Sequence, residues 1–197
     1  MIRAIVMAAA LVAAAPALAP ALAQDARRGE AIAAQSCASC HGADGRSQVA
    51  GVPSLAGQPA EFITLQMILL REGLRQAPPM NEIAKGITDP DVEALAAFYA
   101  GLPPGPPDGR TPRDAAAMER GRALSARMNC GVCHLPAYQG RNQIPRIAAQ
   151  REEYLVHALK DYRDNRRVGT DTQMNAVMYG LPDADIAALA HYLSHLD

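Results

Sequence analysis

The chain has 197 residues and a formal net charge of -1, and 49% of its residues are hydrophobic although only 4% are aromatic. A disordered chain would carry fewer apolar residues and a larger net charge, and a disulfide-rich scaffold would need more than four cysteines. The near-neutral balance gives no electrostatic reason to expect nucleic acid as a partner. We therefore expect a folded chain of one or two ordinary domains.

Residues 1–23 are predicted to be a secretory signal peptide. One early charge, Arg3, precedes an Ala, Leu and Val run that is interrupted by Pro16 and Pro20 and ends in a small-x-small site at Ala23. This pattern is typical of a leader cleaved after Ala23, and an uncleaved membrane anchor is the alternative. No later stretch approaches the ~18 to 20 apolar residues of a membrane-spanning helix. The expected location is the periplasm, with no membrane span after cleavage.

The rest of the sequence predicts an all-α fold. Ala-rich stretches and apolar residues at helical spacing alternate with short polar or Pro-containing segments, and no convincing strand alternation is present. Asp89 and Asp183 each precede an apolar-periodic run and are expected to be helix N-caps. The predicted helices are residues 26–36, 61–74, 89–100, 115–129, 152–163 and 183–196.

The sequence after the leader is an internal duplication. Cys37 to His41 reads Cys-Ala-Ser-Cys-His and recurs 93 residues later, from Cys130 to His134, as Cys-Gly-Val-Cys-His. Further matches follow in the same order at offsets of 92 to 94 residues, which indicates two copies of one domain rather than a solenoid. A Pro- and Gly-rich stretch separates them and is expected to be a semi-rigid linker. The predicted organisation is a first domain at 24–102, a linker at 103–113 and a second domain at 114–197.

Each copy carries the attachment signature of c-type haem, Cys-x-x-Cys-His. The two thiols can add to the two vinyl groups of one porphyrin, and the following imidazole can then ligate the iron. A disulfide within each motif, a thioredoxin-like redox pair and a four-cysteine zinc site are the alternatives, but none of these requires His after the second Cys. We therefore predict two covalently bound haem c groups. The predicted thioether residues are Cys37, Cys40, Cys130 and Cys133.

A six-coordinate haem needs a ligand on the opposite face of the iron. Outside the motif, the only coordinating residue at equivalent positions of both copies is the Met of a repeated Met-Asn pair, at Met80 and Met174. Thioether ligation raises the reduction potential relative to two imidazoles, as suits an electron carrier. Met178 lies one helical turn after Met174 and is the competing ligand, whereas its counterpart Ala84 cannot ligate. The predicted axial pairs are His41 with Met80 and His134 with Met174.

Three other histidines, His157, His191 and His195, have no counterpart in the first copy. These histidines therefore do not belong to a ligand set that both copies share. We expect them to be surface or packing residues.

These motifs resemble those of class I c-type cytochromes, in particular the tandem dihaem cytochromes of bacterial periplasms, over essentially the whole mature chain. The resemblance implies that Gly29 and Gly121 allow the last helix of each domain to cross the first closely. It also implies that the backbone carbonyls of Pro53 and Pro145 accept the ring N–H of the ligand His. One departure is Leu135, which stands where the first copy and most relatives carry Gly.

The function implied by this resemblance is one-electron transfer between redox proteins, without catalysis. The expected donor is a dehydrogenase or membrane complex, and the expected acceptor is a terminal oxidase or reductase. A cytochrome subunit of a periplasmic dehydrogenase complex is the first alternative. A dihaem peroxidase is the second, and the two shared Met ligands argue against it because that enzyme needs an open sixth site.

Overall fold

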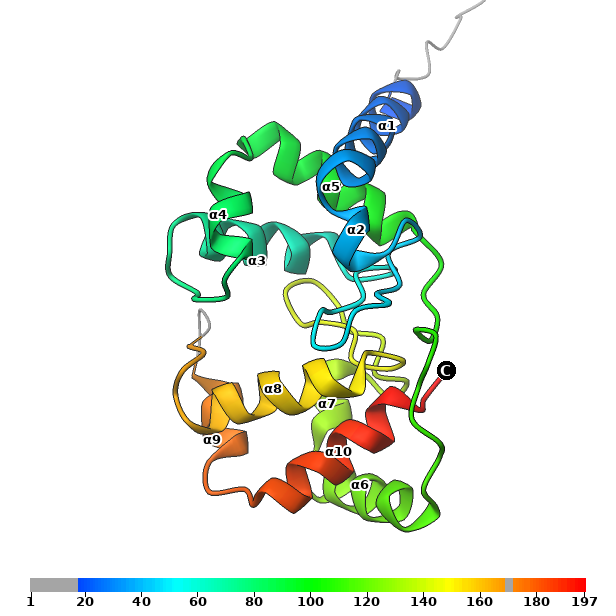
Figure 1. Cartoon of the computed structure of the whole chain (residues 1–197), viewed down its shortest axis with the longest axis vertical. Helices are drawn as coiled ribbons and strands as arrows, with labels where there is room; N and C mark the ends of the chain where they lie inside the picture. Colours follow the sequence, from blue (N-terminus) through cyan, green and yellow to red (C-terminus); the bar gives the residue numbers. More distant parts are fainter. Residues whose placement is uncertain (1–17, 169–171) are drawn as a thin grey trace, which may run out of the picture.

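The computed structural model describes residues 18–168 and 172–197 and contains two helical domains, one above the other (Figure 1). The described residues form no β-strand, and the extended pairing among them is an isolated bridge between Arg141 and Ile144. The predicted all-α class is confirmed. Most of the predicted signal peptide lies outside the described residues, and no helix among those described is long and apolar enough to cross a membrane.

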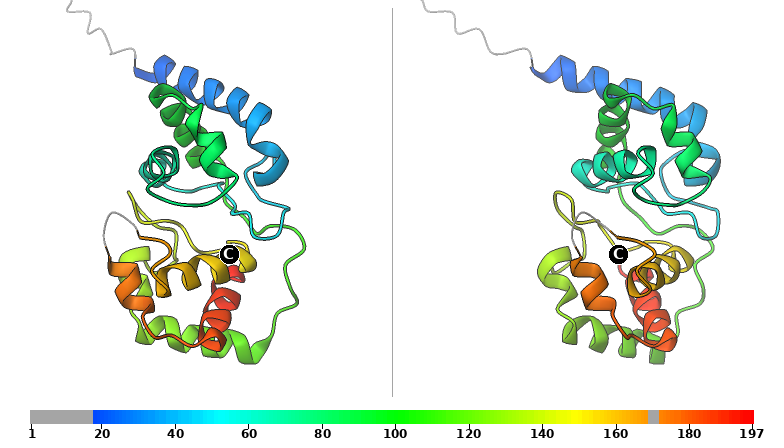
Figure 2. Two further views of the ribbon diagram at one scale, coloured as in Figure 1. Left: turned by 60° about the vertical axis from the view of Figure 1, so that its left-hand side comes forward. Right: turned by 90° about the vertical axis from the view of Figure 1, so that its left-hand side faces the viewer.

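Both domains use the same order of five helices. Those of the first domain are α1 (Leu18–Ser36), α2 (Ala38–His41), α3 (Ala60–Arg71), α4 (Met80–Lys85) and α5 (Asp89–Gly101). Those of the second domain are α6 (Ala115–Arg127), α7 (Cys130–His134), α8 (Glu152–Arg163), α9 (Gln173–Met178) and α10 (Asp183–Ser194). No helix lies between α5 and α6, where the chain runs along one side of the molecule (Figures 1 and 2).

The six longer helices lie where apolar periodicity predicts them, but several ends differ. Helix α1 begins at Leu18 rather than at residue 26, so its first residues belong to the predicted leader, and α6 and α10 each end two residues early. Helix α3 ends at Arg71 rather than Leu74, and Leu74 is 68% exposed. The predicted N-caps are wrong, because Thr88 and Pro182 occupy those positions and Asp89 and Asp183 are the first helical residues. Both carboxylates instead pair with basic side chains of the preceding long helix: Arg71 binds Asp89, and Lys160 and Arg163 bind Asp183.

The first and last helices of each domain cross at a glycine. A Cβ atom added to Gly29 would lie 2.0 Å from the carbonyl oxygen of Ala94 in α5, and one added to Gly121 would lie 2.2 Å from that of Ala188 in α10. Real Cβ atoms do not approach backbone oxygen this closely, so only Gly permits these crossings. The close approach fixes α1 on α5 and α6 on α10, and so positions the motif that follows the first helix of each domain.

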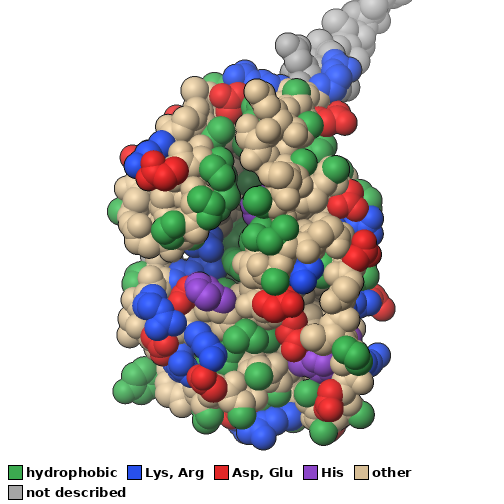
Figure 3. All heavy atoms as spheres, viewed as in Figure 1, with side chains coloured by type: hydrophobic (Ala, Val, Ile, Leu, Met, Phe, Trp, Pro, Cys, Tyr) green, Lys and Arg blue, Asp and Glu red, His purple; other side chains and the backbone are tan. Residues whose placement is uncertain are grey.

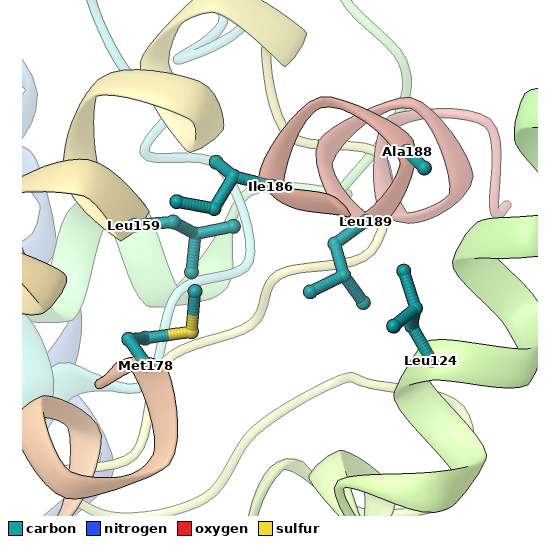
Figure 4. Close-up of a cluster of buried hydrophobic side chains, with 6 residues drawn as sticks. All are labelled: Leu124, Leu159, Met178, Ile186, Ala188 and Leu189. Carbon is teal, nitrogen blue, oxygen red and sulfur yellow. The ribbon is translucent and has the colours of Figure 1, made fainter. Parts of the chain in front are cut away.

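Apolar side chains fill the space between these helices in both domains. In the first, a buried cluster from α1, α3 and α5 also contacts Cys37. In the second, one buried cluster joins α6, α8, α9 and α10, and its side chains point toward one another in Figure 4. The members of this second cluster are Leu124, Leu159, Met178, Ile186, Ala188 and Leu189.

The linker is fastened to the second domain by hydrogen bonds. The hydroxyl of Thr111 donates to Glu152 (2.6 Å), and just beyond the linker the backbone N–H of Asp114 donates to Nε2 of His191 (3.0 Å). The other ring nitrogen of His191 faces Glu152, and the His191 side chain is buried. This histidine is a packing residue, as expected, and the side chain of His157 is 75% exposed.

Candidate haem-binding sites

The first motif lies at the turn between α1 and α2. Cys37 immediately precedes α2 and is half-buried, Cys40 is exposed, and neither forms a disulfide. His41 ends α2 and is buried, with 5% of its surface exposed. The short helix therefore places both thiols and the imidazole within one turn, which is the arrangement that attachment of one porphyrin requires.

The second motif repeats this arrangement on α7. Cys130 is half-buried, Cys133 is exposed, and His134 is 6% exposed. The residue after the histidine has a positive φ in both domains: 83° at Gly42 and 67° at Leu135. The Leu therefore adopts the conformation of the Gly that it replaces, and the loop after the motif keeps its course.

Each motif histidine is held by a proline carbonyl. Nδ1 of His41 lies 2.8 Å from the carbonyl oxygen of Pro53, and Nδ1 of His134 lies 2.8 Å from that of Pro145. A carbonyl can only accept, so the proton resides on Nδ1 and leaves the Nε2 lone pair available to a metal. Burial lowers the pKa of both imidazoles and outweighs the opposing effect of the proline carbonyls. Neutral imidazole is the form that ligates iron.

The two methionines expected on the opposite face lie on short helices that periodicity did not predict. Met80 is the first residue of α4, Met174 is the second of α9, and both are half-buried. The adjacent asparagine holds each helix in place. Asn81 donates to the backbone oxygens of Leu70 and Arg75, at 2.8 and 2.7 Å. The role of this Asn was missed, although the repetition of the Met-Asn pair in the sequence was the available signal.

Asn175 makes the equivalent bonds in the second domain. Its amide donates to the backbone oxygens of Tyr162 and Arg167, each at 2.9 Å. The same element of each domain is therefore tied to the loop that follows the preceding long helix. This equivalence extends the duplication from the sequence to the placement of the two methionines.

Met178, the competing ligand, lies inside the apolar core. Only 2% of its surface is exposed, and it packs with Leu159 and Ile186 (Figure 4). Met174 contacts the same cluster but is only partly buried. The packing role is therefore well defined for Met178, and its counterpart Ala84 is fully buried in the first domain.

The residues of both sites fit covalent haem. Each site offers two unpaired thiols and a neutral imidazole whose Nδ1 is already bonded. In the first domain, the hydroxyl of Tyr99 is buried beside the thiol of Cys37, and no oxygen or nitrogen atom of the described residues bonds it. Sulfur is a weak hydrogen-bond partner, so a bound group that supplies a better one would stabilise this hydroxyl.

Comparison with known proteins finds relatives for both domains. Residues 118–197 match the family described as cytochrome c, and residues 24–98 match that described as cytochrome c oxidase, cbb3-type, subunit III. The chain is 32% identical to cytochrome c4 of Pseudomonas aeruginosa over 88% of its length and 90% of the relative's. The chain belongs to the cytochrome c4 family. It is thus a tandem dihaem class I c-type cytochrome, as the sequence motifs indicate.

Other relatives include a further cytochrome c4 and an electron acceptor of a dehydrogenase. Cytochrome c4 of Thiocapsa roseopersicina is 34% identical over 87% of this chain and 93% of its own. A thiosulfate dehydrogenase electron acceptor of Thiomonas intermedia is 32% identical over 82% of this chain and 78% of its own. These relatives confirm the expected electron-transfer function and the two haem c groups.

Solved structures share the arrangement of both domains. The cytochrome c4 structure from Pseudomonas stutzeri matches with a TM-score of 0.78 and 26% identity, covering 87% of this chain and 98% of that one. A thiosulfate dehydrogenase structure from Marichromatium purpuratum matches with a TM-score of 0.79 and 31% identity, covering 87% of this chain and 40% of that one. The predicted tandem of class I cytochrome c domains is confirmed.

Proposed function

We propose that this cytochrome c4 family member carries single electrons in the periplasm through two haems with His–Met ligation. The proposed axial pairs are His41 with Met80 and His134 with Met174. When bound, haem supplies an iron that takes up and releases one electron. The chain's task is to hold one ligand set through both oxidation states and to keep the iron largely dry.

The observation that carries this proposal is the same ligand geometry in both domains. Each histidine has its ring fixed by a proline carbonyl, and each methionine begins or nearly begins a short helix held by an asparagine. Fixed ligands reorganise little between oxidation states, which favours electron transfer. A peroxidase would need one site with a displaceable ligand, and the two sites offer the same residues.

The proposed partners are redox proteins: a dehydrogenase or membrane complex as donor, and a terminal oxidase or reductase as acceptor. Delivery to the periplasm would follow cleavage of the leader after Ala23. A second candidate function is that of an electron-accepting subunit of a periplasmic dehydrogenase. It is favoured by relatives named as thiosulfate dehydrogenase electron acceptors and as a cytochrome subunit of sulfide dehydrogenase.

Expression with c-type haem maturation, followed by a redox titration of the visible spectrum, tests the proposal. We expect two haems per chain, reversible one-electron steps and low-spin spectra in both oxidation states. The N-terminus of the periplasmic protein should be Gln24. A high-spin component with turnover of hydrogen peroxide would instead support a peroxidase. Co-purification with a dehydrogenase would favour the subunit role over a diffusing carrier.

A further inference from the structure

Two glutamines hold the domains together in a reciprocal way. Oε1 of Gln150 accepts the backbone N–H of Ser54 (2.7 Å), and its Nε2 donates to the backbone oxygen of the same residue (2.9 Å). In the opposite direction, Oε1 of Gln58 accepts the backbone N–H of Arg146 (3.0 Å), and Nε2 of Gln58 donates to the backbone oxygen of Arg146 (2.8 Å). Each domain thus reaches across the boundary seen in Figure 2 and binds one backbone segment of the other.

These four residues occupy matching places in the two copies. Gln150 lies 92 residues after Gln58, and Arg146 lies 92 residues after Ser54. The contact is therefore isologous, with the same patch of each domain facing the other, as in a twofold dimer. Ser54, Gln58 and Gln150 are each at most 6% exposed, so water does not compete strongly for these bonds.

The peptide group that each glutamine binds also holds a haem-ligand histidine. The N–H of Ser54 and the C=O of Pro53 belong to one peptide unit, because Ser54 follows Pro53. That C=O accepts from Nδ1 of His41 at 2.8 Å, while the N–H donates to Gln150. A continuous chain of two hydrogen bonds thus runs from His41 through one planar amide to a side chain of the other domain.

The second domain contains the matching chain. Nδ1 of His134 donates to the C=O of Pro145, and the N–H of the same peptide unit, carried by Arg146, donates to Oε1 of Gln58. Each motif histidine is therefore connected through one peptide to the glutamine of the opposite domain. Neither glutamine touches a ligand directly, and each is accordingly a positioning residue.

We propose that Gln58 and Gln150 tune the haem of the opposite domain by polarising the proline peptide that holds its axial histidine. A hydrogen bond accepted from an amide N–H makes the carbonyl of that amide a better acceptor, because the bonds of a chain polarise one another. The stronger acceptor draws the Nδ1 proton and makes the imidazole a more electron-rich ligand. An electron-rich ligand stabilises ferric iron, so each glutamine lowers the reduction potential across the interface.

This inference rests on the proposed ligation by His41 and His134. It predicts a crossed pattern, in which substituting the glutamine of one domain shifts mainly the reduction potential of the haem in the other domain. Gln150→Leu removes the acceptor from Ser54 and should raise the potential of the first-domain haem more than that of the second. Gln58→Leu should raise the potential of the second-domain haem more than that of the first. The iron–histidine stretching frequency of ferrous protein made five-coordinate should fall at the same haem, measured by resonance Raman spectroscopy.

A purely structural role for the glutamines predicts a different result. Weaker docking would shift both haems together in either variant, or would shift neither, and each of these outcomes overturns the proposal. Gln66→Leu is the matched control, because it removes an interdomain bond to Arg167 and leaves both proline peptides untouched. This control should produce no crossed pattern, and a crossed pattern equal to that of the glutamine variants would also overturn the proposal.

A milder pair of variants keeps the test valid if the Leu variants fail to fold. Gln150→Asn and Gln58→Asn keep an amide but withdraw it by one methylene from the opposite peptide, so the same crossed direction is expected. The visible spectrum of the unaltered protein tests the proposed His–Met ligation separately from the tuning by the glutamines. Low-spin haems with a thioether-to-iron band but no crossed shifts would leave the proposed ligation standing and reject the tuning.

Discussion

Leu135 adopts nearly the backbone conformation of Gly42, its counterpart after the ligand histidine of the other domain. Leu135 has φ of 67° and ψ of 161°, and Gly42 has φ of 83° and ψ of 146°. This region of backbone space is occupied almost exclusively by Gly, because a Cβ atom crowds the neighbouring peptides. The second domain therefore carries local strain that the first one avoids.

Leu135→Gly should stabilise the second domain. Relief of a strained residue is worth about 1–3 kcal/mol, and the greater chain entropy of Gly together with the loss of a half-buried side chain offsets part of it. We expect the free energy of unfolding to rise by about 1 kcal/mol, measured by denaturant titration of the haem-loaded protein. The reverse change, Gly42→Leu, should destabilise, because its Cβ would lie 2.3 Å from the carbonyl oxygen of Arg46. A loss of stability in Leu135→Gly would contradict the assignment of strain.

Gly29→Ala should be strongly destabilising. The added methyl would overlap the carbonyl oxygen of Ala94 and lie 2.8 Å from Cβ of Phe98, so α1 and α5 would have to separate. Overpacking of this kind costs about 3 kcal/mol, which a drop in the thermal midpoint would report. Gly101→Ala is the matched control, since nothing lies within 4 Å of its added Cβ at the end of α5. Equal stability of the two variants would show that the crossing is looser than described.

Much of this fold could be predicted because each signal is local or repeated. Apolar periodicity located the six longer helices, and the duplication located the motifs and methionines. The short helices α4 and α9 could not be predicted, since six residues contain too little periodicity to identify a helix. Asp89 and Asp183 were misread as N-caps because the same residue type also suits the first helical turn.

The contacts between the domains could not be predicted from the sequence. Gln58 and Gln150 align in the two copies, but nothing in their spacing shows that each binds the other domain. Their role depends on how two loops face one another in space (Figure 1), which is a tertiary relationship. The proline carbonyls, in contrast, were expected at Pro53 and Pro145 from the family resemblance, and the structure places both 2.8 Å from the ring nitrogens.

Comparing Met174→Leu with Met178→Leu should show which of the two methionines is the haem ligand and which is a core residue. Loss of Met174 removes the proposed thioether ligand, so the thioether-to-iron absorption band of the ferric protein should fall by about half. Met178→Leu replaces one buried apolar side chain by another of similar volume and should cost less than about 1.5 kcal/mol while leaving the band unchanged. The opposite pattern, with the band halved only in Met178→Leu, would assign the ligand to Met178.

Tyr154 lies at the domain boundary between two guanidinium groups. Its hydroxyl is 3.3 Å from Nη1 of Arg167 and 3.5 Å from Nη2 of Arg75, and both arginines also donate to Oε1 of Gln66. In Figure 3, Lys and Arg side chains gather toward the left, at and below the boundary between the domains. Burial raises the pKa of Tyr154, but the two positive charges outweigh it and lower the pKa to about 8.

This depressed pKa predicts a pH dependence of stability. An unfolded tyrosine has a pKa of about 10, so the folded protein releases this proton at lower pH than the unfolded chain. The resulting stabilisation is fully present above pH ~10 and is lost as the pH falls through about 8. As the pH rises from about 8 to about 10, the free energy of unfolding should therefore increase relative to that of a Tyr154→Phe variant, which lacks the ionisable hydroxyl. Isotope-labelled tyrosine NMR should show one ring titrating near pH 8.

Arg75→Gln supplies the decisive comparison for this titration. Removing one of the two guanidinium groups should return the pKa of Tyr154 toward its ordinary value, and the excess stability above pH ~8 should shrink with it. Arg166→Gln is the control, because Arg166 adjoins Arg167 in sequence but pairs with Asp161 and Asp164. If Arg75→Gln and Arg166→Gln left the tyrosine titration equally unchanged, the paired arginines would not be the cause of the shift, and the charge at the domain boundary would have to be neutralised by another group.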